Sequence, residues 1–161
     1  MLLYAIGAII VGVILIKRGD NLIQKALQCG DEEEKVALVA DDHDVVVEGM
    51  LSILRGEPDI EAASVIVRSG LALPDILREV QPDVLLLDAR MPDFDLLSAL
   101  GQTQALFPRL RVIVVTAHQD PQLVKAASRK GAFGYLLKEE ALSRLLPLAI
   151  RDVAAGQIWF M

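Results

Sequence analysis

Acidic residues follow two aliphatic runs of the chain. Asp88 comes directly after residues 84–87 (VLLL), and Asp41 and Asp42 come directly after residues 36–40 (VALVA). Runs of this kind are typical of parallel strands that are buried on both faces. Because open α/β sheets place ligands at the carboxyl ends of such strands, we expect the three carboxylates to lie together. Carboxylates in this arrangement suit Mg²⁺, which prefers oxygen ligands.

A structural interpretation competes with this one. Aspartate is common in turns and at helix N-caps, where its side chain accepts a bond from a backbone N–H. After Asp41 and Asp42, the apolar residues of segment 44–54 have helical spacing. We therefore expect Asp41, Asp42 or Asp44 to cap that helix. A cap needs one acid rather than three, so the metal-site hypothesis is kept beside it.

Two further aliphatic runs end in residues of complementary chemistry. Thr116 follows residues 111–115 (RVIVV), and Lys138 follows residues 135–137 (YLL). An ammonium group neutralises negative charge and a hydroxyl donates to an oxygen, and a phosphoryl group uses both interactions. Carboxylates, a hydroxyl and an ammonium at four strand ends therefore indicate a site for phosphoryl chemistry.

Such a site requires a sheet that brings four strand ends to one edge. Aliphatic runs alternate five times with segments of helical spacing, which predicts an α/β fold with a right-handed, doubly wound parallel sheet. We expect five strands in the flavodoxin-like order 2-1-3-4-5, with the site at the switch point between the first and third strands. Pro74 and Pro147 fall in predicted helices, where proline is tolerated only in the first turn. The predicted strands are 36–41, 60–66, 83–88, 111–116 and 133–138, and the predicted helices are 44–55, 72–80, 95–106, 120–130 and 143–156.

The composition excludes several classes of function. A net charge of −6 and a pI near 4.9 argue against nucleic-acid binding by this chain, because phosphate contacts need clustered Lys and Arg. The single cysteine, Cys29, excludes an internal disulfide framework and a cysteine-based zinc site. Aromatic residues make up 4% of the chain and give no platform for stacking bases. Trp159 is near the carboxyl terminus, and we expect it to lie too far from the site to report on it.

The amino-terminal segment is strongly apolar. Residues 1–16 (MLLYAIGAIIVGVILI) carry no charge and are followed by Lys17 and Arg18. As a helix they would span about 24 Å, short of a hydrocarbon core of about 30 Å. Three alternatives remain: a short membrane anchor with the rest of the chain in the cytoplasm, a helix that packs on the domain or on a second copy, and an extension foreign to the domain. The acidic run DEEE at 31–34 predicts a boundary between residues 1–34 and a domain at 35–161.

Six motifs are spread along residues 35–160. They are VADDH (39–43), EGM (48–50), LLDARMP (86–92), VTAH (115–118), GAFGYLLK (131–138) and AIRDVAAG (149–156). Together they resemble a response-regulator receiver domain, which has the CheY-like fold, and they are most similar to the NarL/FixJ (LuxR-type) subfamily. The resemblance implies that Asp88 is the phosphoacceptor. It also implies that Asp41, Asp42, Asp88 and the backbone carbonyl of Arg90 hold Mg²⁺.

The resemblance assigns the remaining site residues and the partners. Thr116 and Lys138 would contact the phosphoryl group, and Thr116 and Tyr135 would form the conformational switch. The phosphodonor would be a sensor histidine kinase, and phosphorylation would promote a homodimer. Members of this subfamily continue into a helix-turn-helix domain that 161 residues do not accommodate. We expect either a piece of a longer transcription regulator, which would reach DNA only through the missing carboxyl-terminal domain, or a receiver that stands alone. We expect a cytoplasmic signalling domain rather than an enzyme.

The chain departs from the family pattern, and two other functions remain open. Leu96 follows Asp95 where the family usually has glycine, and a positive φ is costly for leucine, so we expect a reshaped loop. Asp44 adds negative charge near the site. Asp42-His43-Asp44 also fits the nucleophile motif of haloacid-dehalogenase-like phosphatases, although the acidic pair which that family needs after the lysine is missing. The second alternative is a receiver-like scaffold that is not phosphorylated.

Overall fold

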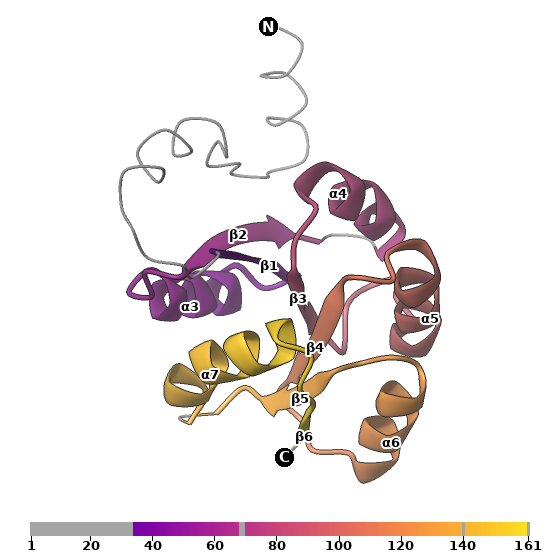
Figure 1. Ribbon diagram of the computed structural model, residues 1–161. Helices are drawn as coiled ribbons and strands as arrows, with labels where there is room; N and C mark the ends of the chain where they lie inside the picture. The colour runs from indigo at the N-terminus through magenta and orange to yellow at the C-terminus, as the bar shows by residue number, and fades with distance from the viewer. Residues whose placement is uncertain (1–33, 68–69, 140, 161) are drawn as a thin grey trace, which may run out of the picture.

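Six parallel strands form the sheet at the centre of the domain. The computed structural model describes residues 34–67, 70–139 and 141–160, and its strands lie in the order β2-β1-β3-β4-β5-β6 (Figure 1). The order predicted for the first five strands is confirmed, with the switch point between β1 and β3. The strands are β1 Lys35–Asp41, β2 Ile60–Ile66, β3 Val84–Asp88, β4 Arg111–Thr116, β5 Gly134–Leu137 and β6 Trp159–Phe160.

Helices cover both faces of this sheet. One face packs against α3 (Asp44–Leu54) and α7 (Leu142–Ala154), and the other packs against α4 (Leu73–Val80), α5 (Leu96–Leu106) and α6 (Pro121–Arg129) (Figure 1). A short 3₁₀ helix, η1 (Gly70–Ala72), precedes α4. The five predicted helices and the five predicted strands all exist, and their predicted ends differ from the observed ends by at most two residues.

The central strand β3 provides a rigid support for its last residue. All of its residues are buried, because β1 and β4 flank it and helices cover both of its faces. Leu85 and Leu87 face the core under α4, α5 and α6, whereas Val84 and Leu86 face the core under α3 and α7. Each such side chain contributes about 1.5–3 kcal/mol by burial. Asp88 therefore ends a strand that is held from both sides.

The sixth strand was not predicted from the sequence. In β6, Trp159 lies opposite Gly134 of β5, and the backbone N–H of Trp159 donates to the Phe133 carbonyl at 2.8 Å. A Cβ atom on Gly134 would lie 3.1 Å from the Trp159 carbonyl oxygen, so glycine permits this close approach. Two residues show no periodicity that could reveal a strand. Trp159, expected to be remote from the site, thus lies beside the strand that leads to Lys138.

The two prolines behave differently. Pro74 lies in the first turn of α4, as predicted. Pro147 lies inside α7, well beyond the first turn, so the prediction for this residue was wrong. Proline removes one backbone bond of the helix at this point. Pro147 is buried along with its neighbours Leu146 and Ile150, and packing of the buried face stabilises the helix despite the missing bond.

The loop after β3 takes its unusual conformation at Asp93. This residue has a φ of 51°, whereas Leu96 begins α5 and is buried in the core at 5% exposure. Asp95 caps α5, and its carboxylate accepts a bond from the Ser98 N–H at 2.9 Å. Leu96 therefore needs no positive φ, because the helix begins where the family usually has glycine.

The amino-terminal segment lies outside the described residues. This concerns residues 1–33, and with them the predicted anchor at 1–16 and the predicted boundary near residue 34. Among the helices that the structure describes, none combines the length and the apolar character needed to cross a bilayer.

Candidate functional site

Strand register brings Asp41 and Asp88 to the same edge of the sheet. β1 and β3 are parallel neighbours in which Ala40 lies opposite Leu87. The acids that follow these two residues are therefore adjacent, as predicted. Asp41 has no exposed surface, whereas Asp88 retains 6% exposure. Of the two carboxylates, Asp88 is the one that a reactant could approach from solvent.

Lys138 connects these two carboxylates. Its Nζ donates to Asp41 Oδ2 at 2.6 Å and to Asp88 Oδ1 at 2.7 Å. Burial of the side chain disfavours the ammonium ion, but the hydrogen bonds and the charges of Asp41 and Asp88 outweigh this effect and raise the pKa of Lys138. The lysine therefore remains charged and holds together two carboxylates that would otherwise repel each other.

The second oxygen of Asp88 is held by the backbone of the following loop. The N–H of Arg90 donates to Asp88 Oδ2 at 3.1 Å. The carboxylate is thus fixed by an ammonium group at one oxygen and a backbone amide at the other. This contact places the Arg90 backbone beside Asp88, while the role expected for the Arg90 carbonyl stays a prediction.

Asp42 and His43 extend the acidic cluster. One ligand atom from each of Asp41, Asp42 and His43 can lie within 4.8 Å of the others. Oδ1 of Asp42 is buried and makes no hydrogen bond in the described structure, although His43 Nδ1 lies 2.8 Å away. A buried carboxylate oxygen that makes no hydrogen bond fits a bound cation. The donor set is thus suited to Mg²⁺.

None of the acids caps the helix that follows them. His43 is the N-cap residue of α3, and its side chain makes no capping hydrogen bond. Oδ1 of Asp41 accepts from the His43 N–H at 2.9 Å, and Asp44 is exposed in the first helical turn. The prediction of a cap was therefore wrong, and Asp41 is instead a member of the cluster around Lys138.

Thr116 and Tyr135 are connected through the backbone of His118. Thr116 ends β4, and its Oγ1 accepts from the His118 N–H at 3.4 Å. Tyr135 is 1% exposed, and its hydroxyl donates to the His118 carbonyl at 3.2 Å. Burial and the charge of Asp120 raise the pKa of the Tyr135 hydroxyl, so it remains a donor. Tyr135 thus points into the domain in this structure, while its role in a conformational switch stays a prediction.

Thr116 and Lys138 are also joined through the backbone. The N–H of Lys138 donates to the Thr116 carbonyl at 2.8 Å. All five site residues predicted from strand ends therefore lie at one edge of the sheet. The connecting role of the His118 backbone was not predicted, because a backbone contact leaves no signal in residue type.

A second ion cluster was also missed. On α7, Arg151 donates through Nε and Nη2 to the two oxygens of Asp59 at 2.8 and 2.7 Å, and it also contacts Glu57. Its partners immediately precede β2, at the opposite edge of the sheet from Asp88. No local pattern connects residues that are more than ninety positions apart in the chain.

The comparisons with known proteins establish the family. The response regulator receiver domain family matches residues 37–149, and the chain belongs to it. The oxygen regulatory protein NreC of Staphylococcus haemolyticus is 33% identical over 123 residues, which cover 76% of this chain and 56% of NreC. The response regulator GacA of Pseudomonas aeruginosa is 35% identical over 122 residues, covering 74% of this chain and 55% of GacA. The chain thus spans about half the length of these curated relatives.

Solved structures agree with this assignment. The signal receiver domain of the response regulator NarL from Mycobacterium tuberculosis superposes with a TM-score of 0.69 at 29% identity, covering 78% of this chain and 99% of that domain. The receiver domain of RcsB from Salmonella enterica gives a TM-score of 0.71 at 24% identity, over 80% and 94% of the two chains, and supports the fold alone. The resemblance to NarL/LuxR-type receivers is confirmed. Membership places the chain among the receiver domains of two-component phosphoacceptor signalling.

Proposed function

We propose that Asp88 is the residue that accepts the phosphoryl group, and that a sensor histidine kinase is the donor. The observation that carries the proposal is the contrast between the two carboxylates bonded to Lys138. Asp41 is fully buried, whereas Asp88 keeps some exposure at the end of the central strand. A carboxylate that solvent reaches and that an ammonium group orients is suited to nucleophilic attack.

The proposed step transfers a phosphoryl group from a phosphorylated histidine of the donor to the free carboxylate of Asp88. An oxygen of Asp88 attacks the phosphorus atom while the bond from phosphorus to the histidine nitrogen of the donor breaks. The product is an acyl phosphate on Asp88, and the electron pair of the broken bond stays on the donor imidazole. Lys138 neutralises charge on the phosphoryl oxygens, and the Thr116 hydroxyl donates to one of them.

Mg²⁺ is the cofactor that we propose for this site. Asp41, Asp42, Asp88 and the backbone carbonyl of Arg90 would hold it, and the unpartnered oxygen of Asp42 supports this assignment. When bound, the ion lowers the repulsion between an anionic donor and the carboxylates. Since few protein ligands are offered, we expect weak binding in which the ion keeps several waters.

The chemical test is intact-mass measurement. With Mg²⁺ and acetyl phosphate, the full chain should gain one phosphoryl group that is lost in Asp88→Asn. The matched control is Asp152→Asn, an exposed acid on α7, which should be labelled like the wild type. Label that persists in Asp88→Asn but disappears in Asp42→Asn would contradict the proposal in favour of a phosphatase nucleophile. A chain that takes no label while it binds Mg²⁺ would favour the scaffold alternative.

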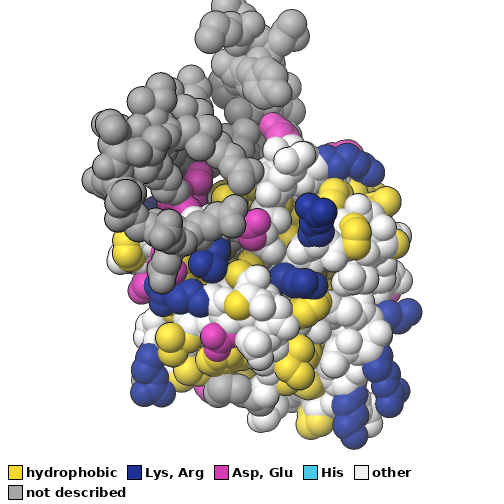
Figure 2. Space-filling model, viewed as in Figure 1, with side chains coloured by type: hydrophobic (Ala, Val, Ile, Leu, Met, Phe, Trp, Pro, Cys, Tyr) yellow, Lys and Arg dark blue, Asp and Glu magenta, His cyan; other side chains and the backbone are white. Residues whose placement is uncertain are grey.

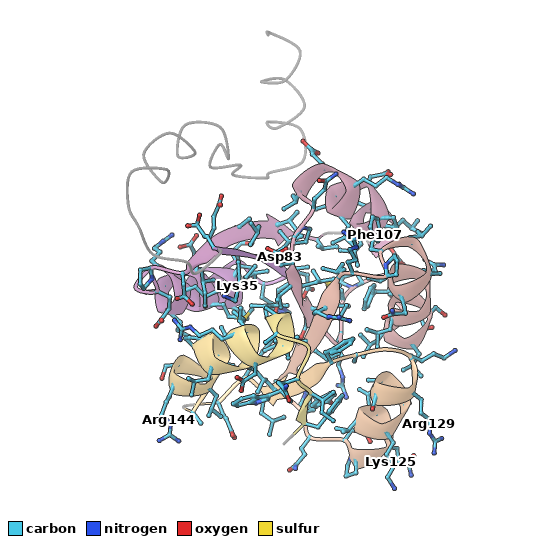
Figure 3. All side chains as sticks on the ribbon, in the orientation of Figure 1. Lys35, Asp83, Phe107, Lys125, Arg129 and Arg144 are labelled. Atoms are coloured by element: carbon cyan, nitrogen blue, oxygen red, sulfur yellow. The ribbon has the colours of Figure 1, made fainter. Side chains whose placement is uncertain are left out.

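We also propose that phosphorylation acts on the surface formed by α6, β5 and α7. Tyr135 lies under this surface beside a cavity of about 280 Å³ whose walls include Leu142 and Leu145 of α7. Figure 2 shows Lys and Arg side chains gathered over the part of the surface where α6 lies. Figure 3 labels Lys125 and Arg129 on this helix. A basic patch on a chain of net charge −6 favours association with the acidic remainder of a second copy.

The switch is tested with beryllofluoride, a mimic of the acyl phosphate. Sedimentation and amide exchange of the full chain should change around residues 117–138 when the mimic binds. A ligand shifts such an equilibrium only by its differential affinity for two states, so we expect partial changes. The similar proteins LnrK of Bacillus subtilis and DegU of Brevibacillus brevis are transcriptional regulatory proteins of which the matched part covers 54% and 52%. We therefore propose a transcriptional output through a further domain, and a cytoplasmic location.

A further inference from the structure

A cavity opens between α4 and α5 at the edge of the sheet opposite to Asp88. Its volume is about 470 Å³, within the range of roughly 300–1,000 Å³ that is typical of ligand pockets. Leu77, Pro82, Phe107, Pro108 and Leu110 supply the apolar walls. No residue of the phosphoryl site lines it. An occupant of this cavity would therefore be distinct from the phosphoryl group.

Exposed apolar side chains extend this surface along α5. A smaller hollow shares Phe107 with the cavity and is lined also by Leu106 and Pro74. Leu106 is 52% exposed, and Leu71 of η1, which follows Gly70 in the wall of the smaller hollow, is 84% exposed. Large exposed aliphatic side chains beside an apolar cavity are typical of a binding groove. We define this α4–α5 groove by Leu71, Leu106, Phe107 and the cavity walls.

The start of the domain lies against the wall of this groove. Asp83 lines the cavity, its Oδ2 accepts from the Val36 N–H at 2.8 Å, and its own N–H donates to the Val36 carbonyl at 2.9 Å. Figure 3 shows Asp83 between Lys35 and Phe107. Val36, near the start of β1, is therefore bonded directly to a residue that lines the cavity, and the chain before β1 starts close to it.

We infer that the apolar segment at residues 1–16 of the same chain docks in the α4–α5 groove. The intervening residues 17–34 reach at most about 60 Å when extended, which is ample for a groove beside β1. A segment tethered this closely has an effective concentration in the millimolar range. As a helix, the segment is also about 6 Å too short for a hydrocarbon core.

Charge favours the same occupant. Arg109 lies exposed at the rim of the cavity and has no ion-pair partner among the described residues, and Arg78 at the same rim is paired with Asp75. The run DEEE at 31–34 separates the apolar segment from β1. An acidic tether that passes a basic rim is attracted to it at moderate ionic strength. The inference does not depend on phosphorylation of Asp88.

Paramagnetic NMR of the full chain tests this inference. A spin label at Ala8→Cys in a Cys29→Ser background should suppress the amide signals of residues 77–83 and 107–110. Signals of residues 148–154 on the opposite face should keep their intensity, and reduction of the label should restore all signals. Ile9→Asp combined with Ile10→Asp should restore the groove signals without any change to the described domain.

Two charge-reversal variants test whether the acidic tether is attracted to the basic rim of the cavity. Arg109→Glu should weaken the paramagnetic loss at the groove, whereas Arg129→Glu, the same change on α6, should leave it intact. Groove signals that the label does not affect, together with sedimentation of the chain with phosphatidylglycerol vesicles, would assign the segment to a membrane and overturn the inference. Suppression that appears equally when label and ¹⁵N are on different chains would assign the groove to a second copy instead.

Discussion

Lys138 and Arg151 each hold two carboxylates, at opposite edges of the same sheet. Around Lys138 the side chains are almost enclosed, with 0% exposure for Asp41, 6% for Asp88 and 15% for the lysine itself. Around Arg151 the exposure is greater, at 33% for the arginine and 13% for Asp59. Two clusters with the same formal charges thus differ in burial and in the cation that they use.

The choice of cation separates a site that exchanges partners from one that fixes the fold. An arginine fork binds one carboxylate through two parallel bonds in a set geometry. Arg151 uses it on Asp59 and so ties the end of α7 to the turn before β2. A lysine is a compact point charge, and Lys138 gives each carboxylate one bond. In the function we propose, it would leave Asp88 for a phosphoryl oxygen while it keeps Asp41.

The largest effect is expected when the buried cluster is broken. Lys138→Ala leaves Asp41 and Asp88 adjacent and unpaired, and the free energy of unfolding should fall by about 3 kcal/mol. Urea denaturation at pH 7 without Mg²⁺ measures this, with the exposed Lys130→Ala as the control. Added Mg²⁺ should stabilise the variant more than the wild type. Equal stability of the variant and the wild type would show that water already screens the two acids.

The exposed cluster should matter less for stability and not at all for chemistry. Arg151→Met removes three contacts that are partly solvated, and the free energy of unfolding should fall by about 1–2 kcal/mol. Acyl phosphate formation on Asp88 should remain at the wild-type level. Arg144→Met, an exposed change on the same helix, should affect neither quantity. Loss of phosphorylation in Arg151→Met would mean that the two edges are not independent.

The two clusters should fail at opposite ends of the pH scale. The hydrogen bond from Arg151, partly offset by burial, lowers the pKa of Asp59 from 3.8 to about 2. Its stabilisation is therefore present above pH 3.8 and is lost as the pH falls toward 2. The pKa of Lys138 is raised above 10.5, so its stabilisation is present below that pH and is lost at higher values. In Asp59→Asn, the loss of thermal stability that this residue causes between pH 3.8 and about 2 should disappear, whereas the loss at alkaline pH should remain.

The smallest expected effect is a change in the fluorescence of Trp159, at one end of β5, when beryllofluoride binds at the other end. Trp159 lies opposite Gly134 at the beginning of this strand, and Lys138 follows the end of it. Beryllofluoride should change the tryptophan emission slightly, by a few nanometres or a small loss of intensity. Asp88→Asn is the control in which the mimic should have no effect. An emission that is constant while the mimic binds would confine the response to the edge that carries Asp88.

The sequence predicted those parts of the molecule in which a residue's role follows from its position in an element. Aliphatic runs revealed β1, β3 and β4, and the residues after them had to meet at one edge because parallel strands share their direction. The contact of Asp41 with Asp88 and Lys138 follows from this rule alone. The metal fit of Asp42 required coordinates, because an unpartnered oxygen is invisible in a sequence.

The failures have a common physical origin in contacts made at long range. β6 exists because β5 offers it an edge, and Pro147 is accepted because tertiary packing outweighs a lost backbone bond. The Arg151 cluster joins residues that are far apart in the chain. His43 rather than an acid occupies the N-cap of α3, since Asp41 is bonded to Lys138 at the site.

The backbone of His118 makes this position suitable for engineering. Its N–H and its carbonyl serve Thr116 and Tyr135, whereas its own side chain is exposed to solvent. Both contacts use main-chain atoms, so they are kept with almost any side chain at this position. A cysteine introduced there could carry a small environment-sensitive dye beside the Thr116 and Tyr135 hydroxyls, both of which contact the backbone of this residue. Residue 118 is thus a position at which a fluorescent sensor of this receiver can be built without altering the groups that it reports on.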